Sequence, residues 1–219
     1  MPKKKEEELR IGDSSQARFE FRSFGKNFET VVKKMAELSA PVPAWVKERS
    51  SDEIYIISKK DDSNNIKIRK KEIEIKTLLK IVDGMEQWKS LIKIKFPISA
   101  EMLKNQILPI LQIKIVDFKK DQKNRCTQAE FFKIIKQNPE FQIVKVSKQR
   151  FGFFVNNTIC ETANVWIGGV KLASVASEST KTADIKKTIA DLGLEKIENI
   201  NYIQAIKRVV EIVNKPLAN

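Results

Sequence analysis

The 219-residue sequence contains no histidine. This absence excludes Ser-His and Cys-His nucleophile systems and the common zinc sites. Glutamate, aspartate, lysine and tyrosine remain as the groups for proton transfer, and carboxylates remain as the expected metal ligands. A bound metal would therefore be a hard ion, Mg²⁺ or Mn²⁺, held by oxygen atoms.

Cysteine is also scarce. Cys126 and Cys160 are 34 positions apart and form no C-x-x-C motif, which is typical of reduced thiols in a cytosolic protein. No apolar run approaches the roughly 18 residues of a membrane-spanning helix, and the first residues are too charged for a signal peptide. We therefore expect a soluble, cytoplasmic protein with no membrane partner. Neither G-x-x-x-x-G-K-[ST] nor G-x-G-x-x-G occurs, so Gly168-Gly169 is interpreted as a hairpin turn.

Basic residues, by contrast, are abundant. The chain has 41 lysines and arginines against 28 aspartates and glutamates, a formal net charge of +13 with a pI near 9.6. Such an excess attracts phosphate chains, nucleic acids and acidic membrane surfaces, without choosing among them. Residues 1–16 are charged and lack periodicity, so we expect a disordered tail there. A single globular domain is expected over residues 17–214.

The most informative stretch is residues 64–77, NNIKIRKKEIEIKT. Charged side chains alternate with isoleucines here, and successive residues of a strand point to opposite faces of a sheet. The charged positions change parity between Lys71 and Glu72, so both halves share one face only if a tight turn or a bulge separates them. The stretch predicts two strands, each with an apolar face and an ionic face, and we interpret the ionic face as the working surface.

The rest of the chain predicts further strands and amphipathic helices around a lysine-rich connector at residues 117–125. Strands are expected over residues 17–24, 53–58, 90–96, 141–155, 158–167 and 170–179. Helices are expected over residues 28–38, 99–111, 127–136, 180–192 and 201–213. There is no βαβ alternation, and long antiparallel strands tend to close on themselves to remove edges. The pattern predicts an α+β fold, a closed or nearly closed antiparallel eight-stranded β-barrel forming a tunnel, with amphipathic helices packed on the outside.

Ionic positions recur on strands from both ends of the chain. They are Arg18, Glu20, Arg22, Lys67, Arg69, Glu74, Lys76, Lys93, Lys95, Lys148, Arg150, Glu161 and Glu178. If the barrel closes around them, its interior is positive with a few carboxylates, which suits a phosphate chain together with a divalent ion. The alternative is an ordinary solvated sheet face of mixed charge.

In the order and spacing of these motifs, residues 17–210 resemble the CYTH, or triphosphate tunnel metalloenzyme, superfamily. That superfamily has an E-x-E-x-K strand, an L-R-I-R-like strand, a strand ending in lysine, and late strands with K-x-R and single glutamates. The corresponding residues here are Arg18-Phe-Glu20-Phe-Arg22, Ile66-Lys67-Ile68-Arg69, Glu74-Ile-Lys76, Lys148-Gln-Arg150, Glu161 and Glu178. GMEQWK at residues 84–89, KFP at 95–97, and LGL followed by NINY at 192–202 resemble uncharacterised bacterial proteins of similar layout.

The resemblance implies roles for individual residues. Glu20, Glu74, Glu161 and Glu178 would bind Mg²⁺ or Mn²⁺, and Glu161 and Glu178 would be catalytic. The phosphate-binding residues would be Arg18, Arg22, Lys67, Arg69, Lys76, Lys93, Lys148 and Arg150. Arg18 departs from the motif, since the superfamily has its first glutamate there. We expect this exchange to lower the affinity for metal and raise the affinity for anions.

The leading hypothesis is a metal-dependent phosphohydrolase acting on inorganic or organic triphosphate in a positively charged tunnel. The alternatives are a non-catalytic binder of polyphosphate, nucleotide or RNA 5′ ends, and a class IV-like nucleotidyl cyclase that releases pyrophosphate. A basic protein that binds nucleic acid on its outer surface is a further alternative, and steep salt dependence would reveal it. The sequence leaves the oligomeric state open.

Overall fold

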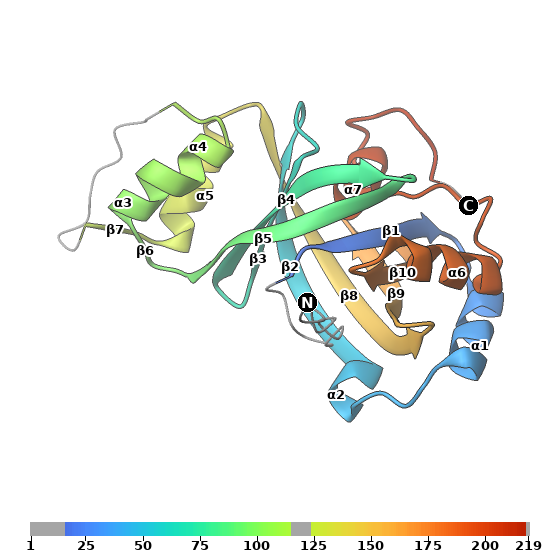
Figure 1. The fold of residues 1–219 in the computed structure, drawn as a ribbon. Helices are drawn as coiled ribbons and strands as arrows, with labels where there is room; N and C mark the ends of the chain where they lie inside the picture. The colour runs from blue at the N-terminus through green and yellow to red at the C-terminus, as the bar shows by residue number, and fades with distance from the viewer. Residues whose placement is uncertain (1–15, 115–123, 218–219) are drawn as a thin grey trace, which may run out of the picture.

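Eight strands form one closed antiparallel barrel in the computed structural model, which describes residues 16–114 and 124–217 (Figure 1). The order around the barrel is β1-β10-β9-β8-β2-β3-β4-β5, and β5 pairs with β1 to close it. Their bounds are Arg18–Gly25 (β1), Glu48–Ser58 (β2), Asn64–Arg69 (β3), Glu72–Val82 (β4), Met85–Lys95 (β5), Phe141–Val155 (β8), Thr158–Ile167 (β9) and Val170–Ser179 (β10). The predicted fold class is confirmed. The predicted tail, apart from Gln16, and most of the predicted connector lie outside the described residues.

The expected tight turn in the central stretch is present. Lys70 and Lys71 both have positive φ angles, 49° and 60°, and join β3 to β4 as a two-residue hairpin loop. Lys67 is therefore opposite Glu74, and Arg69 is opposite Glu72. Both charged runs share one face of the hairpin, as the parity change requires.

One hairpin was not predicted from the sequence. Asp83 and Gly84, with φ angles of 53° and 76°, join β4 to β5, so β5 begins at Met85 rather than at residue 90. Asp-Gly is a strong signal for a turn of this kind. The register between β4 and β5 shifts twice, between Ile75 and Lys76 and between Leu78 and Lys80. These irregularities explain why simple alternation does not continue through this region.

Helices cover the outer faces of the barrel. A continuous helical segment comprises α3 (Ala100–Met102), η1 (Leu103–Ile107) and α4 (Leu108–Ile110), and it lies beside α5 (Gln128–Lys136) on one side of the barrel (Figure 1). A short pairing of β6 (Ile98–Ser99) with β7 (Arg125–Cys126) accompanies them. On the other side are α1 (Glu29–Leu38) and α6 (Thr182–Leu192), with α2 (Ala44–Lys47) before β2. Thr127 caps α5 in a capping box, as its position before the helix predicted.

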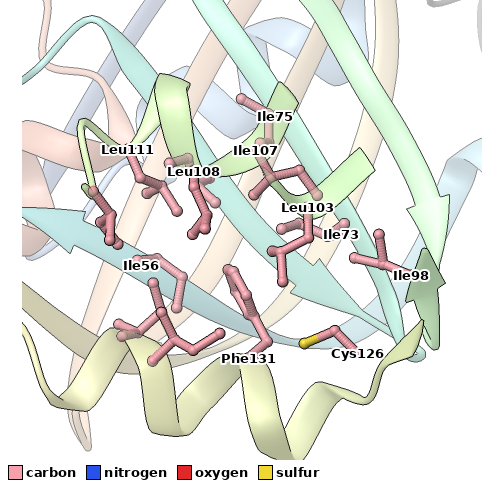
Figure 2. Close-up of a cluster of buried hydrophobic side chains, with 14 of the residues drawn as sticks. Ile56, Ile73, Ile75, Ile98, Leu103, Ile107, Leu108, Leu111, Cys126 and Phe131 are labelled. Atoms are coloured by element: carbon pink, nitrogen blue, oxygen red, sulfur yellow. The ribbon is translucent and has the colours of Figure 1, made fainter. Parts of the chain in front are cut away.

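The isoleucines of the central stretch face these helices. Figure 2 shows Leu103 and Ile107 from the helical segment and Phe131 from α5 directed toward Ile73 and Ile75 of β4. All five side chains are fully buried. Since the isoleucines alternate with charged residues, their burial on the outside turns the charged residues into the barrel. Hydrophobic packing outside thus creates the ionic interior.

The last helix, α7 (Tyr202–Val209), has a different position. Tyr202, Ile203 and Ile206 pack in one buried cluster with Tyr55 and Val146. Tyr55 is two residues from Glu53 and Val146 is two residues from Lys148, so both point to the inner face of the sheet. The helix therefore closes one end of the barrel against its apolar inner residues.

The segment before α7 completes the wall beside β1. The backbone N–H of Arg22 donates to Asn199 Oδ1 at 2.8 Å, and the Ile200 N–H donates to the Arg22 carbonyl at 2.6 Å. Asn199 Nδ2 also donates to the Gly84 carbonyl at 2.8 Å. These bonds fasten α7 to β1 and to the β4–β5 turn. None of the described helices is long and apolar enough to span a membrane.

Candidate anion-binding site

The barrel interior holds two cavities, of about 280 Å³ and about 150 Å³, that share several lining residues. We call their combined space the lumen. Every residue predicted as a site residue lines it: Arg18, Glu20, Arg22, Lys67, Arg69, Glu74, Lys76, Lys93, Lys148, Arg150, Glu161 and Glu178. Lys95 is exposed and does not line it. The structure thus brings the predicted residues together, while their roles stay predictions.

Arginines and glutamates form a chain of ion pairs along one wall. Arg22 Nε donates to Glu20 Oε1 at 2.5 Å, and Arg22 Nη1 lies 3.4 Å from Glu161 Oε1. Arg49 Nη2 donates to the other oxygen of Glu161 at 2.7 Å. Burial raises the pKa of Glu161, but the nearby charges of Arg22, Arg150 and Arg49 more than offset it, so the pKa is lowered overall.

A second group of charges surrounds Glu53, a residue that the sequence analysis did not select. Its carboxylate is 2.8 Å from Lys148 Nζ and accepts a hydrogen bond from the Tyr55 hydroxyl at 3.2 Å. Arg69 and Arg150 each approach it to 3.8 Å. The side chain of Glu53 has no solvent exposure. Burial alone would raise the pKa of Glu53, but these cations hold it well below its usual range.

One buried carboxylate is thus shared by several cations. Burial lowers the pKa of Lys148 from 10.5 to about 7, Glu53 opposes the shift, and the positive charges of Lys67 and Arg150 add to it. The negative charges of Glu53 and Glu74 raise the pKa of Lys67 despite its burial. As pH rises, Lys148 therefore loses its proton before Lys67 does. Near neutral pH, Lys148 is poised between its charged and neutral forms.

The lowered pKa of Lys148 predicts how the stability of the folded chain depends on pH. The pKa of Lys148 is about 7 in the folded chain against 10.5 normally, so between these values the unfolded state binds more protons than the folded state. Stability should therefore rise with pH from about 7 to 8.5, by up to about 1.4 kcal/mol per pH unit. Urea unfolding across this range measures the slope, and Lys148→Met should abolish it. An equal slope in both proteins would contradict the assignment.

Two further carboxylates have raised pKa values. Burial raises the pKa of Glu178, and the charge of Glu20, its partner in the β1–β10 register, raises it further. Arg18 Nη1 is 3.7 Å from Glu178 Oε2. Glu86, also missed from the sequence, has a pKa raised by burial although Asn201 Nδ2 donates to both of its oxygens at 2.9 and 3.0 Å. Glu178 is the one of these two that lines the lumen.

The inner end of the lumen is aromatic. The ring of Tyr202 lies 3.5 Å from Lys148 Nζ and 4.7 Å from the guanidinium carbon of Arg22, measured to the ring centroid. Tyr55 stacks on Tyr202 with centroids 5.8 Å apart. Cation–π contacts of this kind hold the basic groups in place while α7 closes the barrel end. Only the position of NINY in the resembling segment hinted at a role for Tyr202.

The predicted metal ligands do not fit a metal ion as they are arranged. Of the residues that the structure describes, no three histidines, cysteines or carboxylates are grouped so that they could hold one. Glu20 and Glu161 accept from arginines, Glu178 lies near Arg18, and Glu74 is 3.2 Å from Lys67 Nζ. A divalent ion would have to displace these basic groups. Mg²⁺ or Mn²⁺ as a cofactor stays a prediction.

The fold and the lumen define a closed eight-stranded antiparallel barrel with a predominantly basic interior. No family model matches this chain, and a comparison with curated proteins found no match. Several solved structures have a similar fold. A candidate adenylate cyclase from Bacillus halodurans aligns at a TM-score of 0.48 with 9% identity, covering 87% of this chain and 98% of its own.

Two other similar structures are described as triphosphatases. An adenylyl cyclase-like protein from Hippeastrum with a dominant triphosphatase activity aligns at a TM-score of 0.45 with 11% identity, covering 88% of this chain and 96% of its own. The Mimivirus capping enzyme triphosphatase aligns at a TM-score of 0.44 with 10% identity, covering 83% of this chain and 90% of its own. The similarity concerns the fold.

Proposed function

We propose that the lumen binds the triphosphate group of a small molecule or of an RNA 5′ end. One observation carries the proposal: nine basic side chains and four carboxylates line the two lumen cavities, a formal excess of five positive charges. A partly enclosed site with such an excess attracts a compact polyanion more strongly than a solvated surface does, because the surrounding protein screens charge less than water.

The types of basic residue also suit phosphate. Arg18, Arg49, Arg69 and Arg150 line the larger cavity. Guanidinium groups present several N–H donors in a fixed plane and bind two phosphate oxygens at once, while lysines such as Lys76 supply mobile point charges. The resemblance of these motifs to the triphosphate tunnel superfamily supports the same class of ligand.

A second candidate function is hydrolysis of the bound triphosphate, with Glu178 as general base. Its raised pKa makes it a better proton acceptor than an ordinary carboxylate, and it lines both cavities. Glu178 would accept a proton from the water that attacks the terminal phosphorus. The bond from that phosphorus to its bridging oxygen would break, so the diphosphate part of the ligand is the leaving group and orthophosphate is the other product. A cyclase would instead release pyrophosphate from a nucleoside triphosphate.

Calorimetric titration with tripolyphosphate tests the binding proposal. We expect saturable binding by the wild type and a loss of about tenfold to a hundredfold in affinity for Arg150→Ala, because a hydrogen bond to a charged group contributes about 1.5–3 kcal/mol. Lys89→Ala, which removes an exposed charge on β5, is the control and should bind like wild type. Absence of binding by the wild type, or equal binding by Arg150→Ala, would refute the proposal.

Phosphate release from the same ligand separates the binder from the hydrolase. Glu178→Gln keeps the shape of the side chain but cannot accept a proton, so it should retain binding and lose release. Assays with Mg²⁺, with Mn²⁺ and with chelator test the cofactor prediction. Wild-type binding without release under all three conditions would favour the non-catalytic alternative.

A further inference from the structure

The carboxylates that match the metal ligands of the resembling superfamily are bound by arginines in this chain. Glu20 accepts from Arg22 Nε at 2.5 Å, and Glu161 accepts from Arg49 Nη2 at 2.7 Å. Arg22 also reaches Glu161 at 3.4 Å, so one guanidinium lies between the two carboxylates. A guanidinium and a divalent ion compete for the same oxygen atoms and repel each other. These two carboxylates are therefore arranged to hold arginine.

Arg18 extends this arrangement toward Glu178. It stands at the position of the first glutamate in the motif, faces the lumen, and its Nη1 lies 3.7 Å from Glu178 Oε2. A carboxylate at this position would attract a divalent ion. A guanidinium repels it and presents N–H donors to an anion instead. Because Arg18 lies beside Glu178, it also offsets the charge that Glu178 would otherwise offer to a metal.

We infer that the lumen takes its triphosphate ligand as the metal-free anion, with the guanidinium groups of Arg18, Arg22 and Arg49 in place of a divalent ion. The inference rests on the proposed function and narrows its ligand class to the free polyphosphate. Mg²⁺ bound to a polyphosphate covers the oxygens that the arginines would contact. Excess Mg²⁺ should therefore compete with the protein for the ligand.

Titration of the full chain with tripolyphosphate in EDTA, and again with excess MgCl₂ or MnCl₂, tests the inference. The dissociation constant in EDTA should be lower than the constant with either metal, because the metal competes for the phosphate oxygens. Binding that requires a metal, or that a metal leaves unchanged or tightens, would overturn it. No binding under any condition would refute the proposed function instead, so the two failures are distinct.

Arg18→Glu restores the first glutamate of the motif and gives a second test. Metal-free binding should weaken by about tenfold or more, because a charge-assisted contact is replaced by repulsion. The variant should also gain Mn²⁺ binding without phosphate, measured by the electron paramagnetic resonance signal of the free ion. Lys89→Glu makes the same charge change at an exposed position and should do neither.

Arg18→Glu could fail to fold, since the new carboxylate would lie near Glu178 and Glu20. A third variant therefore provides an independent test. Arg18→Gln removes the charge without adding repulsion, and it should weaken metal-free binding without gaining Mn²⁺. Thermal denaturation establishes that each variant is folded. Unchanged metal-free binding in Arg18→Gln would overturn the inference. Binding of Mn²⁺ by the wild type in the absence of phosphate would overturn it as well.

Discussion

Glu53→Gln is expected to lower the free energy of unfolding by about 3–5 kcal/mol, the cost of removing one partner from a buried ion pair. The Glu53 carboxylate has no solvent exposure and lies among Lys148, Arg69 and Arg150. Without its charge these cations repel one another in a poorly screened interior. Chemical denaturation monitored by circular dichroism measures the change.

The loss should depend on pH. In Glu53→Gln the pKa of Lys148 falls below its wild-type value of about 7, since the opposing carboxylate charge is gone. At about pH 6 the wild type holds a proton on Lys148 that the variant has lost. The difference in unfolding free energy between the two proteins should therefore be larger at about pH 6 than at about pH 8. Glu72→Gln, at the looser 3.7 Å pair with Lys93, is the control and should change stability by less than about 1 kcal/mol. A loss of that small size in Glu53→Gln would contradict the interpretation of this cluster.

Tyr202→Ala should be nearly as damaging, with an expected loss of about 3–5 kcal/mol, the range for truncating a buried aromatic side chain. The ring contacts Phe24 at 4.9 Å and Tyr55 at 5.8 Å between centroids, and lies over Lys148. Its removal leaves a hole at the closed end of the barrel. Thermal and chemical denaturation both measure the effect.

The control for this prediction is Tyr202→Phe, which keeps the ring and removes the hydroxyl. It should retain most of the stability, because the ring makes the contacts with Phe24, Tyr55 and Lys148. If Tyr202→Ala and Tyr202→Phe lose stability equally, the hydroxyl rather than the ring holds α7 in place. If neither loses stability, α7 does not close the barrel as the structure shows.

Local pattern sufficed for most of the strands and most of the inward residues. Alternation between isoleucine and charge at Ile66, Lys67, Ile68 and Arg69 is a property of neighbouring residues in the chain, and the period of a strand converts it directly into two faces. The same reasoning placed Glu161 and Glu178 on the inner face. Where the β4–β5 register shifts, the alternation fails, and the start of β5 at Met85 was missed for that reason.

Contacts between distant segments required the tertiary structure. Glu53 is the first residue of the mostly apolar run EIYIIS, and its sequence neighbours do not indicate that Lys148 and Arg150 lie beside it. The pairing of Arg49 with Glu161 joins residues 112 positions apart through the neighbouring strands β2, β8 and β9. Such pairs depend on strand order and register, which short-range periodicity does not contain.

The amino-acid sequence by itself determined most of the side chains that face inward, because that follows from the two-residue period of a strand and from burial of the isoleucines outside. Only the tertiary structure decided how the inward charges pair and that α7 closes one end of the barrel. Barrel closure and the register of each strand set those distances. Electrostatic energy depends on distance and burial rather than on order along the chain.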